Sequence, residues 1–216
     1  MTADFSVRFF DLDAVTVDEA LLAERERERV ARKGTPGLRQ RQAASFQCLR
    51  VTLGEALGVG PETLAFRVEA SGKPVVVEHA LHFNLSHSDG VGMLAWGPRE
   101  LGADIEALIA RPTDGLAEEI LSPRELDVWR TVPGPERQAW LTRVWARKES
   151  ALKAAGSGLR MSPRLIDVRL APAADAAPQE SRWALRLSER DWHGVDAFDD
   201  VPAGYRAAVC VEAPHD

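Results

Sequence analysis

The sequence predicts an α+β protein of two lobes, each a small, mainly antiparallel sheet packed against a long helix. Apolar residues recur at helical spacing over residues 39–57, and a second long helix is expected over residues 136–155. Short segments of strand-like composition surround these stretches, separated by glycine and proline turns. Because the halves have helix and sheet content of similar size, we expect lobes at 1–98 and 99–216, with the active site in the cleft between them.

The first lobe is expected to begin with a strand over residues 5–10. A helical pattern starts at Val17 and ends in the charged run 24–29. A Gly/Pro cluster at residues 34–37 marks a break before the 39–57 helix. Further strands are expected over residues 66–69, 74–77, 81–86 and 91–96.

The second lobe is expected to open with a strand over residues 101–106. Ser122, Pro123 and Glu125 form a helix start, in which Ser122 is the N-cap and Glu125 closes a capping box. The long helix over 136–155 stops at Gly156 and Gly158. The remaining pattern predicts strands over 166–170, 183–187 and 205–211, with an Ala/Pro-rich loop over 171–181.

Composition describes an ordinary globular protein. Of the 216 residues, 45% are hydrophobic and 28% are charged, and the net charge of -6 argues against a nucleic-acid-binding protein. The two cysteines, Cys48 and Cys210, lie far apart and are expected to be buried in a reducing compartment. We find no secretory signal and no apolar run approaching the roughly 20 residues that span a bilayer, so we expect a cytoplasmic protein without membrane contacts.

Asp104 and Glu106 are the first candidates for chemistry. They lie two residues apart on a predicted strand, so both side chains point to the same face. Adjacent carboxylates repel each other unless a cation or a shared proton relieves them, and such hard oxygen ligands suit Mg²⁺ or Mn²⁺. The pattern alone favours a solvated strand edge, whereas its apolar surroundings favour a metal site.

The stretch 145–156 combines groups that seldom share a helix face. Trp145, Glu149 and Lys153 follow one another at helical spacing, with Lys148 beside Glu149. A surface face would carry the charges without the tryptophan, and a core face the tryptophan without the charges. The stretch therefore indicates a functional site built on a helix.

Four polar residues in the first lobe could bind an anion. Ser86 and His87 end a strand in a polar cluster, where hydroxyl and imidazole groups can donate to phosphate oxygens. Lys73 lies in a turn from which its ammonium can reach a phosphate, and Arg41 lies near a helix start, where a bound anion would ease its charge. Taken singly, each of these residues is also consistent with a solvated or structural side chain.

Taken together, the motifs resemble those of the 4'-phosphopantetheinyl transferases, in the Sfp-type, single-chain, pseudo-dimeric branch. The resemblance is carried by Gly72-Lys73-Pro74, Phe83-Asn-Leu-Ser-His-Ser88, Gly102-Ala-Asp-Ile-Glu106 and Trp145-Ala-Arg-Lys-Glu-Ser-Ala-Leu-Lys153 with Gly156, in that order. The segments 121–126 and 205–210 also look similar to the family. The resemblance covers most of the chain and implies two pseudo-symmetric lobes and a monomer.

The resemblance implies transfer of the 4'-phosphopantetheine arm of coenzyme A to a serine of an acyl or peptidyl carrier protein, releasing adenosine 3',5'-bisphosphate. By this likeness Asp104, Glu106 and Glu149 hold a Mg²⁺ ion on the pyrophosphate. Glu149 is also the base for the carrier serine. Lys153 orients the phosphate or passes a proton.

The same likeness assigns coenzyme A contacts. It implies that Lys73, Ser86 and His87 bind coenzyme A, with His87 at the 3'-phosphate and Arg41 assisting. Lys148 would neutralise the pyrophosphate. The first lobe would then bind coenzyme A, and the second would carry the metal site and the catalytic helix. A surface around residues 107–121 is expected to meet the carrier protein.

Two other functions use some of the same residues. A metal-dependent phosphohydrolase would need the carboxylates, but not the contacts at Lys73 and His87. A non-catalytic module that binds coenzyme A or docks a carrier would not need the acidic residues together with Lys153, so the complete set argues against it.

Overall fold

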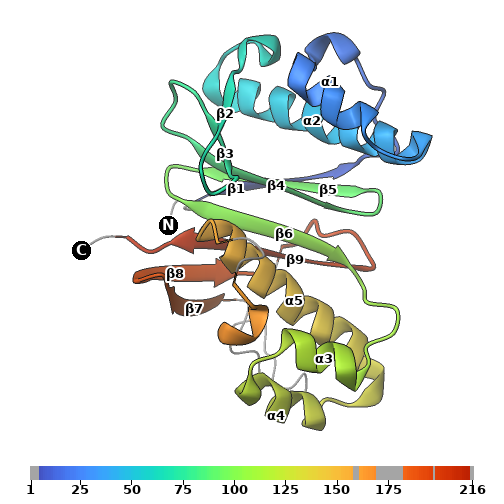
Figure 1. Ribbon diagram of the computed structural model, residues 1–216, viewed down its shortest axis with the longest axis vertical. Coiled ribbons are helices and arrows are strands. Elements are labelled where there is room, and N and C mark those ends of the chain that lie inside the picture. Colours follow the sequence, from blue (N-terminus) through green and yellow to red (C-terminus); the bar gives the residue numbers. More distant parts are fainter. Residues whose placement is uncertain (1–4, 158–160, 169–181, 197, 215–216) are drawn as a thin grey trace.

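The computed structural model describes residues 5–157, 161–168, 182–196 and 198–214, and it combines antiparallel sheets with helices (Figure 1). The mixed α and β content expected from the sequence is therefore confirmed. Among the described residues, no helix is long and apolar enough to cross a bilayer.

The first half is a three-stranded sheet covered by two helices. The sheet has the order β1 (Ser6–Asp11), β5 (Val91–Gly97), β4 (His82–Ser88), and all its pairs are antiparallel. Helices α1 (Glu24–Ala31) and α2 (Pro36–Leu57) lie over it in Figure 1. A separate hairpin pairs β2 (Phe66–Val68) with β3 (Pro74–Val76). All the strands predicted for this half are confirmed.

The helices of the first half begin elsewhere than predicted. The pattern from Val17 yields only a 3-10 turn over Glu19–Leu21, and α1 then runs through the charged stretch instead of ending in it. Helix α2 begins at Pro36, inside the Gly/Pro cluster predicted to be a break. Thr35 is its N-cap, with its hydroxyl accepting from the Leu38 N–H at 3.2 Å, and proline is favoured at the first helical position.

The second half is a four-stranded antiparallel sheet crossed by one long helix. The order is β6 (Leu101–Ala107), β9 (Tyr205–Glu212), β8 (Arg190–Val195), β7 (Arg182–Leu187). Helix α5 (Arg137–Ala154) packs on β6 and β9, and α3 (Asp114–Ile120) and α4 (Pro123–Thr131) lie near its N-terminal half (Figure 1). Helix α3 and strand β8 were not predicted from the sequence.

The predicted start of α4 and the predicted end of α5 at Gly156 are confirmed, whereas Gly158 lies outside the described residues. The Ser122 hydroxyl accepts from the Glu125 N–H at 3.3 Å, and the Glu125 carboxylate accepts from the Ser122 N–H at 2.8 Å. This is the reciprocal pair of a capping box. After α5, Gly156 adopts the left-handed conformation with φ of 64°, which glycine enters without the cost that other residues incur.

The strand predicted over 166–170 is wrong in its described part. Residues 166–168 form no strand, because buried side chains hold their backbone. The carbonyls of Ile166 and Val168 accept from Lys148 and Arg147, and the Val168 N–H donates to Glu125. These bonds replace a strand ladder. Residues 169–170 and the predicted loop 171–181 lie outside the described residues.

Strand β6 is the element that joins the two halves. Its backbone pairs with β9, and side chains of β4 contact its other edge. The Asn84 carbonyl oxygen accepts from the Ala103 N–H at 2.8 Å, and the Ser88 hydroxyl accepts from the Ala107 N–H at 3.1 Å. Side chains of β4 therefore lie directly beside those of β6, and this arrangement creates the site described next.

Candidate active site

A carboxylate, a hydroxyl and an ammonium group from three elements meet at the centre of the molecule. Asp104 of β6 is 2% exposed, and its Oδ1 accepts from Ser86 Oγ of β4 at 2.9 Å and from Lys153 Nζ of α5 at 2.5 Å. Lys153 Nζ also contacts Ser86 Oγ at 3.0 Å. The fold therefore brings together three residues predicted from motifs in different parts of the chain.

Glu106 lies on the same face of β6, as the period of two predicted. Its Oε1 accepts from the indole N–H of Trp145 at 3.0 Å, and its Oε2 accepts from Ser88 Oγ at 3.0 Å. Trp145 belongs to the same helical row as Glu149 and Lys153. One polar edge of this tryptophan therefore orients a carboxylate of the site, which explains an aromatic residue in a charged row.

Ser88 belongs to the polar cluster around His87 that the sequence predicts could bind an anion, but its contact with Glu106 was not predicted. It lies two residues after Ser86 on β4, so alternation places both hydroxyls on one face. That spacing was a usable signal. It could not be interpreted from the sequence alone, because the acceptor Glu106 belongs to a strand that follows in the chain.

Two buried carboxylate oxygens, Asp104 Oδ2 and Glu149 Oε1, have no hydrogen-bond partner among the residues that the structure describes. Burial raises the pKa of Asp104 to about 7, and the charge of Glu106 acts in the same direction, while Lys153 and Ser86 oppose them. Burial also raises the pKa of Glu149, again with Glu106 adding to the effect and Lys153 opposing it. The pKa of Glu149 therefore responds to the charges of both Glu106 and Lys153.

The chemistry of the donor set fits a divalent cation. Within the described part of the chain, no three His, Cys, Asp or Glu side chains already stand in a metal-binding arrangement. Nevertheless, the unpartnered oxygens of Asp104 and Glu149 are hard donors in a buried site, and a cation would satisfy both. Asp104, Glu106 and Glu149 therefore fit such an ion in chemical type.

His87 and Arg41 lie apart from this group. His87 follows Ser86 on β4, so its side chain points to the opposite face and is exposed. Partial desolvation lowers the pKa of His87, and the positive charges of Lys33 and Lys153 add to the effect. Arg41 makes two hydrogen bonds of 2.7 Å to the carboxylate of Asp13.

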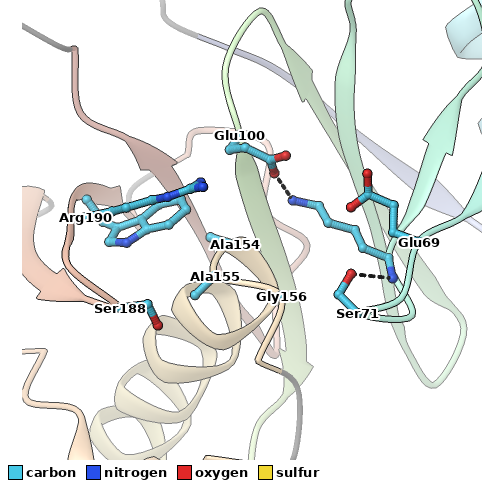
Figure 2. A pocket seen from close by; sticks show the side chains of 10 residues that line it. Glu69, Ser71, Glu100, Ala154, Ala155, Gly156, Ser188 and Arg190 are labelled. Atoms are coloured by element: carbon cyan, nitrogen blue, oxygen red, sulfur yellow. Dashed lines mark hydrogen bonds and ion pairs between the residues drawn. The ribbon is translucent and has the colours of Figure 1, made fainter.

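Lys73 lies at the edge of a cavity between the two halves. It is 9% exposed, forms an ion pair with Glu100 and donates to the Leu101 carbonyl at 2.9 Å. The cavity has a volume of about 290 Å³, with Ser71 on one side and Arg190 on the other (Figure 2). The expected phosphate contact of Lys73 would require its ammonium to leave these partners.

Lys148 points away from the other site residues into the core of the second half. It has no exposed surface, and its Nζ lies 2.6 Å from Glu125 Oε2. The same Nζ donates to the carbonyls of Pro163 at 2.9 Å and Ile166 at 2.6 Å. Burial lowers the pKa of Lys148, while Glu125 opposes this effect. With its donors used in this way, Lys148 is directed away from the side chains around Asp104.

An apolar groove of about 370 Å³ adjoins the carboxylates on the side of Trp145. Its lining also includes Glu106, Ile109, Leu116, Glu119, Ile120 and Pro163. Part of this lining falls within the segment 107–121 that was expected to meet a carrier protein. The groove starts at Glu106, so a molecule bound at the carboxylates could extend into it.

Comparisons with known proteins point to one family. The profile of the ACPS 4'-phosphopantetheinyl transferase superfamily matches residues 100–210. The 4'-phosphopantetheinyl transferase HetI of Nostoc sp. is 36% identical over 175 residues, covering 77% of this chain and 73% of HetI. The 4'-phosphopantetheinyl transferase Sfp of Bacillus subtilis is 26% identical over 153 residues, covering 70% and 64%. A holo-[acyl-carrier-protein] synthase of Hamiltonella defensa is 33% identical over 97 residues, covering 42% and 75%.

Proposed function

The chain belongs to the 4'-phosphopantetheinyl transferase superfamily, and we propose that it transfers the 4'-phosphopantetheine arm of coenzyme A to a serine hydroxyl of a carrier protein. The observation that carries this proposal is the grouping of Asp104, Glu106, Glu149 and Lys153 around two unpartnered carboxylate oxygens. All four lie inside the segment that the superfamily profile matches. Neither the phosphohydrolase nor the non-catalytic module has comparable support.

The reaction exchanges one oxygen on phosphorus for another. The carrier serine oxygen forms a bond to the phosphorus next to the pantetheine arm, and the bond from that phosphorus to the bridging oxygen breaks. Adenosine 3',5'-bisphosphate leaves with the electron pair of that bond. Little covalent chemistry is required of the protein, which has to position the groups and neutralise developing charge.

Glu149 is our candidate for the base that accepts the serine proton. Its buried Oε1 would bind the cation, and the second carboxylate oxygen of this half-buried side chain would accept a hydrogen bond from the incoming hydroxyl. Burial raises the pKa of Glu149, which makes its carboxylate a stronger base. Such assistance typically contributes roughly 10² to 10⁴-fold in rate. Lys153 lies next to the reacting phosphate in this scheme and would orient it.

Asp104, Glu106 and Glu149 would hold a Mg²⁺ or Mn²⁺ ion. When bound, the ion would act as a Lewis acid on the pyrophosphate oxygens. The residues themselves contribute the negative charge that attracts the cation. Trp145 and Ser88 fix both oxygens of Glu106, so the orientation of this carboxylate toward the cation would be set in advance.

We propose that coenzyme A lies between the halves of the chain. Ser86 would donate to the pyrophosphate by giving up its hydrogen bond to Asp104, and His87 would bind the 3'-phosphate on the other side of β4. Lys73 and Arg41 would also bind coenzyme A, each by exchanging its carboxylate partner for phosphate oxygens. Lys148 has no place in this binding site, because it is buried and paired with Glu125.

We further propose that residues 1–98 and 99–216 are two pseudo-symmetric lobes of a monomer. The order β1-β5-β4 in the first sheet corresponds to β6-β9-β8 in the second. In each half a long helix covers the sheet, and the cavity near Lys73 is lined from both halves. These correspondences support the division and the cleft.

Mass spectrometry tests the function directly. An apo acyl or peptidyl carrier protein incubated with the enzyme, coenzyme A and Mg²⁺ should gain the mass of phosphopantetheine. Glu149→Gln should reduce the rate by about 10²-fold or more, because the amide cannot accept the serine proton. Glu62→Gln, a change at an exposed glutamate of the first half, is the matched control and should transfer normally. Absence of transfer by the unaltered enzyme to a panel of carriers would refute the proposal.

A further inference from the structure

A buried ammonium group on α5 binds one carboxylate and two carbonyls at the same time. Lys148 Nζ contacts Glu125 of α4 and the carbonyls of Pro163 and Ile166. Glu125 in turn accepts from the N–H groups of Ser122 and Val168, both at 2.8 Å. We call Lys148, Glu125 and these backbone groups the α5 clamp. It joins α5, the start of α4 and the segment 163–168.

The first half contains a cluster of the same design. Arg50 of α2 contacts Glu26 of α1 at 2.7 Å and donates to the carbonyls of Pro61 and Leu64, both at 3.0 Å. Glu26, like Glu125, also accepts from the N–H of the residue three positions earlier, Ala23, at 2.8 Å. We call this cluster the α2 clamp. In both halves a buried cation on the long helix thus fixes a carboxylate and the carbonyls at and after a 3-10 helix.

Only the α5 clamp lies next to the candidate base. Glu149 follows Lys148 in the chain, and its Oε1 has no hydrogen-bond partner. No contact of that oxygen therefore fixes the side chain, and its position depends on the rotation and the axial placement of α5. The rotation and axial placement of α5 are set on its buried side by Lys148 and by the neighbouring Arg147. Arg147 contacts Asp196 at 2.7 Å and the Val168 carbonyl at 3.0 Å.

We propose that Lys148 is a positioning residue that holds Glu149 in its reactive place through the α5 clamp, and that it never contacts the pyrophosphate. The inference rests on the proposed function, because Glu149 has a reactive place only if the chain is a transferase. Misplacement of a reacting group by about 1 Å can reduce a rate by roughly 10²-fold. The clamp would therefore matter for turnover although it lies outside the site.

Lys148→Met removes the ammonium and keeps an unbranched apolar side chain in the core. Glu125 is then a buried charge without its cation, so the melting temperature should fall by about 10 °C. Below that temperature, kcat should fall about 10-fold or more, whereas the KM for coenzyme A should change less than about 3-fold, since no phosphate contact is lost. A phosphate ligand would behave in the opposite way, with a raised KM and an unchanged melting temperature.

The double variant Glu125→Gln/Lys148→Met provides the decisive comparison. A neutral glutamine side chain in place of Glu125 would leave no uncompensated charge. Its oxygen could still accept from the Val168 N–H, and its amide could donate to the carbonyls that Lys148 released, although the Ser122 N–H would lose its acceptor. We expect the double variant to recover part of the lost melting temperature and part of the lost kcat. A double variant no better than Lys148→Met would overturn the proposal. If Lys148→Met fails to fold, the double variant alone decides. A folded and active double variant supports the clamp. A double variant that binds coenzyme A about 10-fold more weakly or worse overturns the proposal.

The α2 clamp supplies the matched control. Arg50→Met breaks a buried ion pair of the same design, so it should lower the melting temperature by a similar amount. Its kcat at saturating coenzyme A should be unchanged, because α2 carries no candidate base. If Arg50→Met lost as much kcat as Lys148→Met, general destabilisation would explain the loss in both variants. That result would overturn the positioning role of Lys148. If the unaltered enzyme transfers nothing, the proposed function fails, and the melting temperatures still show whether the clamp exists.

Discussion

Asp104 is a buried carboxylate in which one oxygen has hydrogen-bond partners and the other has none among the described residues. Its Oδ1 has Ser86 and Lys153 as partners, and its Oδ2 has none. Burying a charged oxygen without a partner costs folding free energy. Such an oxygen is therefore typical of a site where a ligand binds. The cost has a measurable consequence in the metal-free protein.

Stability of the metal-free protein should depend on the ionisation of Asp104. Burial raises its pKa from 3.8 to about 7, so the folded state binds this proton more tightly than the unfolded chain. The resulting stabilisation is greatest below about pH 4 and is lost as the pH rises toward 7. Asp104→Asn cannot ionise and avoids this loss. The melting temperature of the variant relative to the unaltered protein should therefore rise by about 5 °C or more between pH 5 and pH 8.

Scanning calorimetry in the presence of a chelator measures this difference. Asp127→Asn, at an exposed position, is the control and should show no such trend. Adding Mg²⁺ at pH 8 should raise the melting temperature of the unaltered protein more than that of Asp104→Asn, because the amide is a poorer ligand for the cation. A difference that stays constant from pH 5 to pH 8 would contradict the assignment.

At the scale of elements, α5 determines the site because it presents different chemistry on different faces. Trp145, Glu149 and Lys153 face the carboxylates of β6, whereas Arg147 and Lys148 point into the core toward Asp196 and Glu125. The backbone of α5 approaches β6 closely at Gly102. A Cβ atom there would lie 2.2 Å from the Ser150 carbonyl oxygen and from the Ala154 N.

Gly102→Ala should push α5 away from β6. Both atoms that the added methyl group would meet belong to the helix backbone, so the clash cannot be relieved by a side-chain rotation. Overpacking of this kind costs about 1–3 kcal/mol or more, which corresponds to a melting temperature lower by several degrees. Gly115→Ala is the control, since nothing lies within 4 Å of an added Cβ on α3. Equal melting temperatures for the two variants would show that β6 and α5 do not pack this tightly.

At the scale of the whole molecule, side chains join the two sheets where a strand ladder would otherwise be expected. Asn84 and Ser88 of β4 accept hydrogen bonds from the backbone of β6, and Ser86 between them reaches Asp104. The site is consequently shared between the halves. Anything that separates β4 from β6 should weaken both the fold and the site.

Asn84→Ala tests this junction. The substitution leaves the buried Ala103 N–H without an acceptor, at a cost of about 1–3 kcal/mol. Asn84→Asp, which keeps an acceptor oxygen at the same position, is the comparison variant. We expect the alanine variant to melt several degrees lower and the aspartate variant to retain the Ala103 bond, as seen in slow amide exchange at Ala103. Fast exchange at Ala103 in the unaltered protein would exclude the bond.

Much of the site could be predicted from the sequence because its signals are local. The spacing of Asp104 and Glu106 on a strand, the row Trp145, Glu149 and Lys153 on a helix, and the capping box at Ser122 each depend on the geometry of one element. The start of α2 also had a local signal in Thr35-Pro36, but the neighbouring glycines favoured a break. Motif order was enough to indicate the family.

Tertiary structure alone decided which charges meet at the candidate site and which are paired elsewhere in the fold. Lys148 stands beside Glu149 in the chain, yet its ion-pair partner Glu125 lies 23 residues earlier. Arg41 pairs with Asp13, and Lys73 pairs with Glu100, across similar separations in sequence. The prediction of a strand over 166–170 is wrong in its described part, 166–168, for the same reason, since side chains of α5 hold the carbonyls there. Propensity and spacing describe one element at a time. The pairing and desolvation of a charge depend on elements that only the folded chain brings together.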